Sequence, residues 1–247
     1  MIFQNRVQAG RMLAARLMPL HGQDLVVLGL PRGGVPVAYE VAKELHAPLD
    51  VIVVRKLGVP SQPELAMGAA GEGGVVVINQ EVARMIHVDR DDFARVEARE
   101  RKEVERRAKS FRGDRLGVSL KGRIALVIDD GIATGSTAQA ACKVARASGA
   151  TKVILAVPVG AADSLRALQT DADEVICLYI PERLYSVGEW YEDFSATSDD
   201  EVVKLLRDAS LNIATASSNT RTDAVVQSPT RDDEIKDQPE PSSWRVI

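Results

Sequence analysis

Short apolar runs that alternate with amphipathic helical stretches constrain the fold of this chain more than any other feature. Candidate strands lie at 25–28, 49–54, 124–128, 153–157 and 174–178, and helical spacing of apolar residues occurs at 5–18, 35–45, 137–148 and 161–169. Continuous apolar runs of this length are typical of strands that are buried on both faces. The alternation therefore predicts an α/β fold with a mostly parallel central sheet and helices on both faces.

The composition is that of a globular protein and excludes several other classes. The chain has 247 residues, of which 45% are hydrophobic, enough for one domain with a sizeable core. Its apolar runs are too short to span a bilayer, so we expect no membrane partner. The net charge of −4 and an aromatic content of 4% argue against nucleic acid as a partner. Two cysteines form no disulfide framework, so we expect a reducing, cytoplasmic location.

Two regions interrupt the alternation of strands and helices. Residues 66–78 are rich in Gly and Val and predict one or two short strands or a hairpin, and residues 80–115 carry dense charges of both signs. The charged stretch fits a solvated helix with i,i+4 ion pairs or a mobile lid over 71–115 whose arginines reach an anionic ligand. Residues 211–247 are rich in polar residues and Pro, so we expect a disordered tail after a domain at 1–210.

The segment with the most chemical information follows the candidate strand at 124–128. Asp129 and Asp130 come directly after that strand, and the loop that precedes the next helix ends in hydroxyl and small residues, namely Ala133, Thr134, Gly135, Ser136 and Thr137. Backbone N–H groups in such a loop and at the start of a helix bind phosphate. The neighbouring carboxylates would repel a phosphate, so they need sugar hydroxyls or a metal ion as partners. The segment therefore predicts a sugar-phosphate site.

This segment resembles the phosphoribosyl pyrophosphate (PRPP) signature of the type I phosphoribosyltransferases. The resemblance covers about residues 1–207 and implies that family's fold, with a small variable hood. It implies that Asp129 and Asp130 hold the ribose hydroxyls and that the loop at 133–137 holds the 5′-phosphate.

The resemblance also assigns a leaving-group site. Arg32, Gly33 and Gly34 follow the first strand, where the family has its pyrophosphate loop, often with an unusual cis peptide. Arg55 and Lys56 match a basic position near the pyrophosphate, although a basic pair at a strand end is also common as a solvated feature. Displacement of pyrophosphate at ribose C1 is the implied reaction, with Mg²⁺ as cofactor bound through PRPP and, in one reading, through Asp129 and Asp130. The implied catalytic residues are Asp129, Asp130, Arg32 and Lys56.

The lid and the acceptor site are less defined by the sequence. Arg84 and Arg112 are candidates for a lid residue that contacts the pyrophosphate. Ala133 stands where 6-oxopurine enzymes of the family carry a base-contacting acid, which argues against hypoxanthine or guanine as acceptor.

The hood is expected at 179–207. There Tyr179, Trp190 and Tyr191 are candidates to stack on a planar acceptor, although the same aromatic residues could simply pack the last helix on the sheet. This stretch resembles the C-terminal part of a poorly characterised group named as phosphoribosyltransferases.

Three functions remain open from the sequence. The first is phosphoribosyl transfer from PRPP to a nucleobase-like nitrogen acceptor in nucleotide metabolism. The second is a non-catalytic regulator that senses PRPP, and the third is a protein that binds another sugar phosphate, such as ribose 5-phosphate. Dimers are common among the relatives that the resemblance suggests, so we expect a homodimer. Cys142 and Cys177 fall within a predicted helix and strand and are expected to be core residues rather than nucleophiles.

Overall fold

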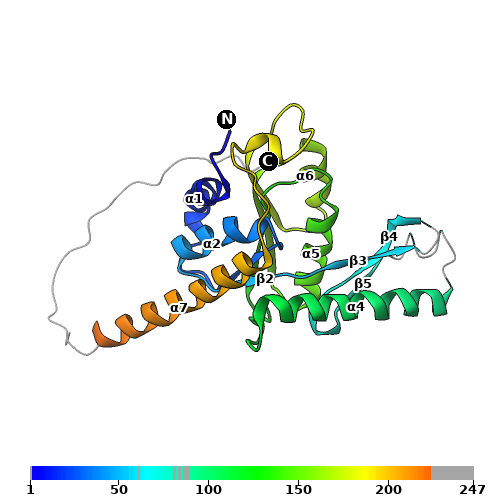
Figure 1. Ribbon diagram of the computed structural model, residues 1–247, viewed down its shortest axis with the longest axis horizontal. Coiled ribbons are helices and arrows are strands. Elements are labelled where there is room, and N and C mark those ends of the chain that lie inside the picture. Colours follow the sequence, from blue (N-terminus) through cyan, green and yellow to red (C-terminus); the bar gives the residue numbers. More distant parts are fainter. Residues whose placement is uncertain (1, 60–61, 80–81, 83–84, 86–88, 224–247) are drawn as a thin grey trace, which may run out of the picture.

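The five candidate strands form one parallel sheet in the computed structural model of the chain, which describes residues 2–59, 62–79, 82, 85 and 89–223 (Figure 1). For 62–64 and 213–223 it describes only the backbone. The strand order is β2-β1-β6-β7-β8, and all neighbours are parallel. The strands are β1 (Leu25–Gly29), β2 (Leu49–Val51), β6 (Ile124–Ile128), β7 (Lys152–Val159) and β8 (Glu174–Tyr179).

Helices cover both faces of this sheet, as the sequence predicts. One face packs on α1 (Arg6–Leu17), α2 (Gly34–Leu45) and α7 (Asp199–Asp223), and the other packs on α5 (Ser136–Ala147) and α6 (Ala162–Leu168). Alternate side chains of β6 enter the two cores: Leu126 and Ile128 pack on the side of α1 and α2, and Ala125 and Val127 on the side of α5. The expected α/β class is therefore confirmed.

A second, antiparallel sheet projects from the side of the molecule together with a long helix (Figure 1). We call this unit the arm. It consists of β3 (Arg55–Val59), β4 (Gln62–Ala70), β5 (Val76–Ile78) and α4 (Arg90–Arg112). The strands at 62–70 and 76–78 confirm the hairpin predicted near 66–78.

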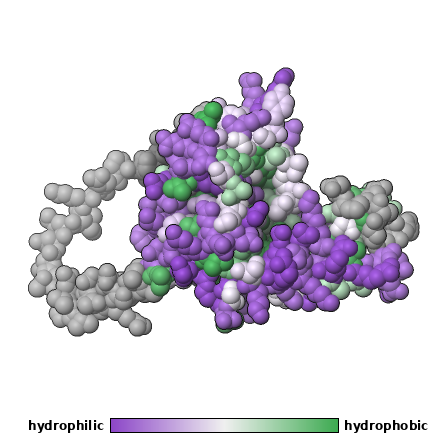
Figure 2. All heavy atoms as spheres, viewed as in Figure 1, coloured by the Kyte–Doolittle hydropathy of each residue, from purple (hydrophilic) through white to green (hydrophobic). Residues whose placement is uncertain are grey.

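The spacing of its buried residues explains why the charged sequence of α4 folds as a helix. Its buried positions recur every three or four residues and form one stripe: Val96, Glu100, Val104, Ala108 and Phe111. Its exposed face carries the expected pairs, among them Arg101 with Glu97 at 3.2 Å and Arg107 with Glu103 at 3.1 Å. Figure 2 shows this hydrophilic surface on the side of the arm.

The second candidate strand is shorter than predicted. We expected a strand over 49–54, but β2 ends at Val51 and the chain leaves the sheet. The N–H of Ile52 still bonds to the carbonyl of Gly29 at 3.1 Å, whereas the N–H of Val53 turns to the Glu72 carboxylate at 3.4 Å. Arg55 therefore begins a strand of the arm instead of ending a strand of the central sheet.

The C-terminal boundary also differs from the expectation. The backbone is helical up to Asp223, so the segment at 211–223 continues α7 where we expected a disordered tail to begin. Val202, Leu206 and Ala209 of this helix are buried in the core beside α2. Residues 224–247, the rest of that expected tail, lie outside the described residues.

Short 3-10 helices complete the described elements: η1 (Met18–Leu20), η2 (Glu72–Gly74) and η3 (Gly188–Trp190). Among the described residues, the helices do not reach the combination of length and apolar character that a membrane crossing requires.

Candidate active site

Two carboxylates stand at the carboxyl edge of the central sheet, directly after β6. The Oδ1 atom of Asp129 accepts the backbone N–H of Asp130 at 2.9 Å. The Oδ2 atom of Asp130 accepts Nε of Arg6, the first residue of α1, at 2.8 Å. The carboxyl edge of a parallel sheet is where ligands bind in open α/β folds, so the pair stands where a site is expected.

Burial raises the pKa of both carboxyls from the ordinary value of an aspartate. For Asp129 the negative charge of Asp130 raises the pKa further. For Asp130 the guanidinium of Arg6 opposes the effect of burial on the pKa. Hydroxyl donors or a cation would stabilise two neighbouring carboxylates of this kind.

The hydroxyl-rich loop after the acid pair is anchored to β7 and leads into α5. Its residue Ile132 bonds to the carbonyl of Val159 at 2.9 Å, and the carbonyl of Ala133 accepts the hydroxyl of Ser164 at 2.6 Å. Gly135 adopts φ of 76°, a left-handed conformation that favours glycine, immediately before the helix begins.

The start of α5 supplies donors beside the acid pair. The hydroxyls of Thr134 and Ser136 lie 3.4 Å apart and are exposed. The first N–H groups of a helix have no partner within it, and Ser136 and Thr137 occupy that first turn. The loop therefore has the donors and the geometry for an anion.

The expected pyrophosphate loop lies against the acid pair. The peptide bond between Pro31 and Arg32 is cis. A side chain at Gly33 would collide with the Asp130 carboxylate, and one at Gly34 would place Cβ 2.6 Å from the Ile128 carbonyl oxygen. Both positions therefore require glycine for close contact between two loops that are far apart in the sequence. The Arg32 guanidinium is half exposed and lies 3.7 Å from the Asp199 carboxylate at the start of α7.

A cavity of about 660 Å³ adjoins this loop and extends under the arm. Its wall contains Pro31, Thr137, Arg55 and Lys56, which come from different segments of the chain, together with residues of α4. Lys56 also borders a smaller cavity of about 100 Å³ beside Ser136. The structure thus brings the expected basic pair to the same region as the two loops.

Helix α4 fixes one member of the basic pair. The Arg55 guanidinium lies 2.9 Å from the carboxylate of Glu100, and Arg99 lies 2.9 Å from the same carboxylate. Glu100 is buried within the apolar stripe of α4. Because both arginines line the same cavity as Glu100, the arm contributes charged groups to the wall of the site.

Only one of the two lid candidates falls within the part of the chain that the structure describes. Arg84 lies outside the described residues. Arg112 is buried at the base of the arm, where it bonds to Asp50 at 2.6 Å, to the carbonyl of Val51 at 2.9 Å and to Glu72. These contacts use both ends of its guanidinium, so Arg112 connects the arm to β2 and does not face the cavity. This geometry places Arg112 away from the cavity beside the expected pyrophosphate loop.

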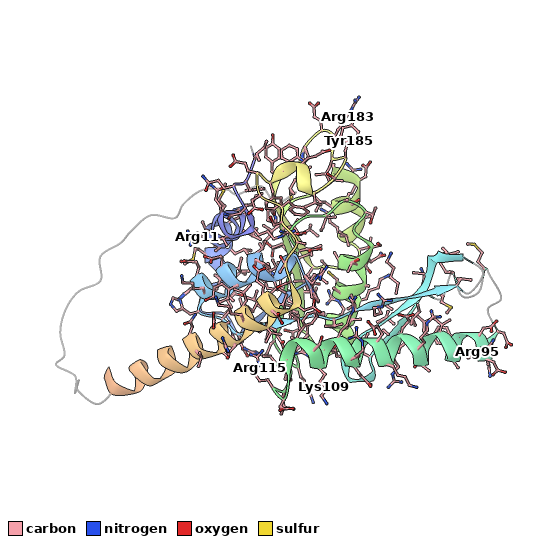
Figure 3. All side chains as sticks on the ribbon, in the orientation of Figure 1. Arg11, Arg95, Lys109, Arg115, Arg183 and Tyr185 are labelled. Carbon is pink, nitrogen blue, oxygen red and sulfur yellow. The ribbon has the colours of Figure 1, made fainter. Side chains whose placement is uncertain are left out.

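The aromatic residues of the expected hood have different roles. The hydroxyl of Tyr191 donates to the Asp130 carbonyl at 2.6 Å, and its buried ring packs on Phe3 and Phe194. Tyr191 therefore supports the acid pair, not a stacked acceptor. The rings of Tyr179 and Trp190 lie 4.8 Å apart, with Tyr179 partly exposed. Beyond them, Arg183 and Tyr185 point away from the body of the molecule (Figure 3).

Arg6 is the main site residue that the sequence analysis missed. Arginine at the first position of a helix is opposed by the helix dipole, which favours acidic residues there. This first turn contains no acid. An unfavourable cation at a helix start was therefore the available signal that Arg6 has a partner elsewhere in the fold.

The cysteines take no part in the site. Burial raises the pKa of Cys142 to about 12 and the pKa of Cys177 to about 11. Both thiols are therefore protonated at neutral pH, which removes the thiolate that nucleophilic chemistry requires. Cys142 is fully buried against the central sheet and Cys177 packs on the same core, as expected.

Comparison with known proteins agrees with this architecture. The family described as "Phosphoribosyl transferase domain" matches residues 2–189. Two curated relatives, from Mycobacterium tuberculosis strains CDC 1551 / Oshkosh and ATCC 25618 / H37Rv, carry the provisional name phosphoribosyl transferase. Each is 54% identical over 235 residues, which is 95% of this chain and 52% of the relative. The chain thus spans about half the length of these relatives.

A solved structure is similar over most of its length. The crystal structure of TT1426 from Thermus thermophilus is 42% identical, with a TM-score of 0.77, and the match covers 83% of this chain and 98% of that one. With the family match over 2–189 and the acid pair between two glycine-containing loops, this chain belongs to the phosphoribosyl transferase domain family.

Proposed function

We propose that the protein transfers the phosphoribosyl group of PRPP to a nitrogen acceptor and releases pyrophosphate. The observation that carries the proposal is the contact between Asp130 and Gly33, which joins the acid pair to the glycine loop beside a large cavity. Membership in the family supports phosphoribosyl transfer in general.

The 5′-phosphate is assigned to the loop at 133–137. Its support is the left-handed Gly135, the exposed hydroxyls of Thr134 and Ser136, and the first turn of α5. A phosphate at this point interacts with unpaired N–H donors and with the positive end of the helix dipole. The ribose is assigned to Asp129 and Asp130, whose oxygens accept hydrogen bonds from its 2′- and 3′-hydroxyls.

The pyrophosphate is assigned to the cavity next to the cis peptide of Pro31 and Arg32. Arg55 and Lys56 line that cavity and offset part of the negative charge of the leaving group. A Mg²⁺ ion fits this arrangement, because Mg²⁺ prefers oxygen atoms in its coordination shell. Oxygens of PRPP, together with Asp129 and Asp130, would supply them. When bound, such an ion would neutralise charge that develops on the pyrophosphate.

The reaction breaks the bond between ribose C1 and the pyrophosphate oxygen, and a bond forms between C1 and the acceptor nitrogen. A proton carried by that nitrogen leaves to the released pyrophosphate or to water. Positive charge develops on the ribose ring during this displacement. The protein's own task is to hold the sugar and phosphates in place and to keep water away from C1. The arm borders the cavity through Val96, Arg99 and Arg107, so it is proposed as the lid over the reacting atoms.

The acceptor is proposed to bind on the hood side of the acid pair. Ala133 provides no carboxylate for a 6-oxopurine, and Tyr191 is occupied by its contact with Asp130. Tyr179 and Trp190 remain as the aromatic pair for a planar acceptor, with Tyr179 partly exposed. The proposed acceptor is therefore a nitrogen heterocycle that needs no carboxylate of the protein for its binding.

The test of transfer is pyrophosphate release from PRPP and Mg²⁺ in the presence of single candidate bases. Adenine, orotate, hypoxanthine and guanine are compared, with reactions lacking a base as the blank. We expect release with a base other than hypoxanthine or guanine. Tight binding of PRPP with no release for any nitrogen acceptor would contradict transfer and favour a PRPP-sensing regulator. Release with guanine alone would contradict the proposed acceptor class.

A further inference from the structure

The side chain of Arg6 connects Asp130 to the segment that follows η3. Its Nε atom lies 2.8 Å from Oδ2 of Asp130, its Nη1 atom donates to the carbonyl of Ser195 at 2.7 Å, and its guanidinium carbon lies 3.9 Å from the centre of the Phe194 ring. The side chains of Arg6 and Asp130 are only 11% and 14% exposed. Charge-assisted bonds are strong when they are shielded from water in this way, so the arginine is held in one orientation.

The same short segment after η3 holds Asp130 from a second direction. The Tyr191 hydroxyl donates to the backbone carbonyl of Asp130 at 2.6 Å, while Phe194 and Ser195 hold the arginine that bonds to its side chain. Gly33 of the glycine loop also lies against the same carboxylate. Asp130 is therefore fixed between the glycine loop, α1 and the segment at 191–195.

Charge gives a reason for this arrangement. Asp129 and Asp130 are neighbouring acids, and among the described residues Arg6 and Tyr191 are titratable groups that interact with them. Arg6 is the cation among these groups, so it offsets repulsion between the two carboxylates. A carboxylate accepts up to about four hydrogen bonds, so the bond from Arg6 leaves capacity for a sugar hydroxyl.

The geometry points to Arg6 as a positioning residue that orients the Asp130 carboxylate to receive a ribose hydroxyl. This inference rests on the proposed function, since it assigns the ribose to the acid pair. The terminal rotation of an aspartate side chain is soft, and the bond to Nε selects one plane of the carboxylate. Preorganisation of this kind increases affinity because less freedom is lost when the sugar binds.

A purely structural role for Arg6 is already covered by other contacts. The N-terminal segment is tied to the hood by three backbone bonds, from Phe3 to Trp190 at 2.8 Å, from Glu192 to Phe3 at 2.8 Å and from Asp193 to Gln4 at 2.9 Å. These bonds remain when the side chain of Arg6 is changed. We therefore expect an Arg6 variant to fold and to lose affinity for ligands that bind at the acid pair.

The test compares ligand fragments on the full chain by isothermal titration calorimetry. The ligands are PRPP, ribose 5-phosphate and pyrophosphate, each with Mg²⁺. The variant is Arg6→Met, which keeps side-chain length without charge. The matched control is Arg16→Met, at an exposed position of the same helix.

We expect Arg6→Met to weaken ribose 5-phosphate and PRPP by about 10- to 100-fold, the usual effect of removing a residue that orients a ligand-binding group. Pyrophosphate binding should stay unchanged, because this ligand has no ribose. Arg16→Met should bind all three ligands like the wild type. Arg6→Lys should recover part of the lost affinity, since lysine keeps the charge but lacks the planar fork.

Other outcomes would contradict the inference, the proposed function or both. Equal weakening of ribose 5-phosphate and pyrophosphate, or no weakening at all, would overturn a role in orienting Asp130. If Arg6→Met does not fold, Phe194→Leu replaces it, with an expected loss of about 2- to 5-fold for the two ribose ligands. Wild-type protein that binds ribose 5-phosphate but no PRPP would overturn the proposed function alone, and wild-type protein that binds neither would overturn both.

Discussion

The Cα atom of Gly33 faces the Asp130 carboxylate so closely that no side chain fits between them. This contact joins the loop after β1 to the acid pair after β6. The two strands are neighbours in the sheet, with Gly29 opposite Ile128, so the loops that follow them meet at one edge. The site therefore depends on strand pairing as much as on the motif residues themselves.

Gly33→Ala should disable the site without unfolding the chain. The new Cβ would displace the Asp130 carboxylate, and we expect PRPP affinity to fall by about 100-fold, in the range seen when a ligand-orienting contact is lost. Calorimetric titration with PRPP and Mg²⁺ measures this. Gly117→Ala is the matched control, because a Cβ there would make an ordinary contact at 3.4 Å from Arg112. Wild-type affinity in Gly33→Ala would contradict the assigned role of the loop contact.

Asp129→Asn should stabilise the protein at neutral pH. The pKa of Asp129 is raised in the folded state by burial and by the charge of Asp130, so ionisation of this group opposes folding. This penalty is present above the folded-state pKa and absent below the unfolded-state pKa of about 4. We expect a gain of about 0.5–2 kcal/mol in unfolding free energy at pH 8, the usual range for relieving an unfavourable site group.

The pH series supplies the control for this change. The gain in unfolding free energy of Asp129→Asn over the wild type should shrink as the pH is lowered from 8 toward 5. Thermal unfolding at each pH measures this gain. Asp163→Asn, at an exposed acid of α6, should show no such trend. A gain that grows on acidification would contradict the assigned direction of the pKa shift.

Glu100→Gln should loosen the arm. Glu100 is buried and holds Arg55 and Arg99, but both arginines are partly exposed, so we expect a loss of about 1–2 kcal/mol rather than the larger effect of a fully buried pair. Chemical denaturation measures this loss. Glu97→Gln, which removes one i,i+4 pair on the same helix, should lose less than about 0.5 kcal/mol. Equal losses in the two variants would show that Glu100 does not fix the arm.

Proteolysis tests whether the arm is the lid. PRPP and Mg²⁺ are added at about 100 times the dissociation constant. If the protease cuts within 71–115 only after the ligand has left and the arm has opened, cleavage should slow by up to about 100-fold. Inorganic phosphate with Mg²⁺ serves as the control, because it does not fill the pyrophosphate cavity and the ribose site together. Identical digestion rates with PRPP and with phosphate would remove the arm from the proposed mechanism.

The sequence predicted the parts of the fold that local patterns determine. Apolar runs predicted the parallel strands, and the period of α4 agreed with an exposed, ion-paired helix. The predicted end of β2 was wrong because Val53 and Val54 are apolar whether or not they belong to the central sheet. The long-range bonds of Val51 to Arg112 and of Val53 to Glu72, at the point where the chain leaves that sheet, are not visible in the sequence. The length of α7 was missed because its polar C-terminal part lacks an apolar stripe.

Within the site, the acid pair and both loops could be predicted because each lies in a short motif next to a strand. The contacts of Arg6 and Tyr191 with Asp130 could not be predicted, since these residues lie 124 and 61 positions away from it in the sequence. Arg112 shows a second limit of prediction from the sequence. It lies in a segment with many charges, and nothing in that segment indicates that Asp50 and Glu72 are its partners.

Titration of the full chain with PRPP, with and without Mg²⁺, tests the central claim most directly, when wild type is compared with the double variant Asp129→Asn, Asp130→Asn. The account predicts metal-dependent binding to the wild type at about micromolar affinity and its loss in a double variant that remains folded. Equal binding of PRPP by both proteins, or none by the wild type, would contradict the assignment of the acid pair to the ribose of PRPP.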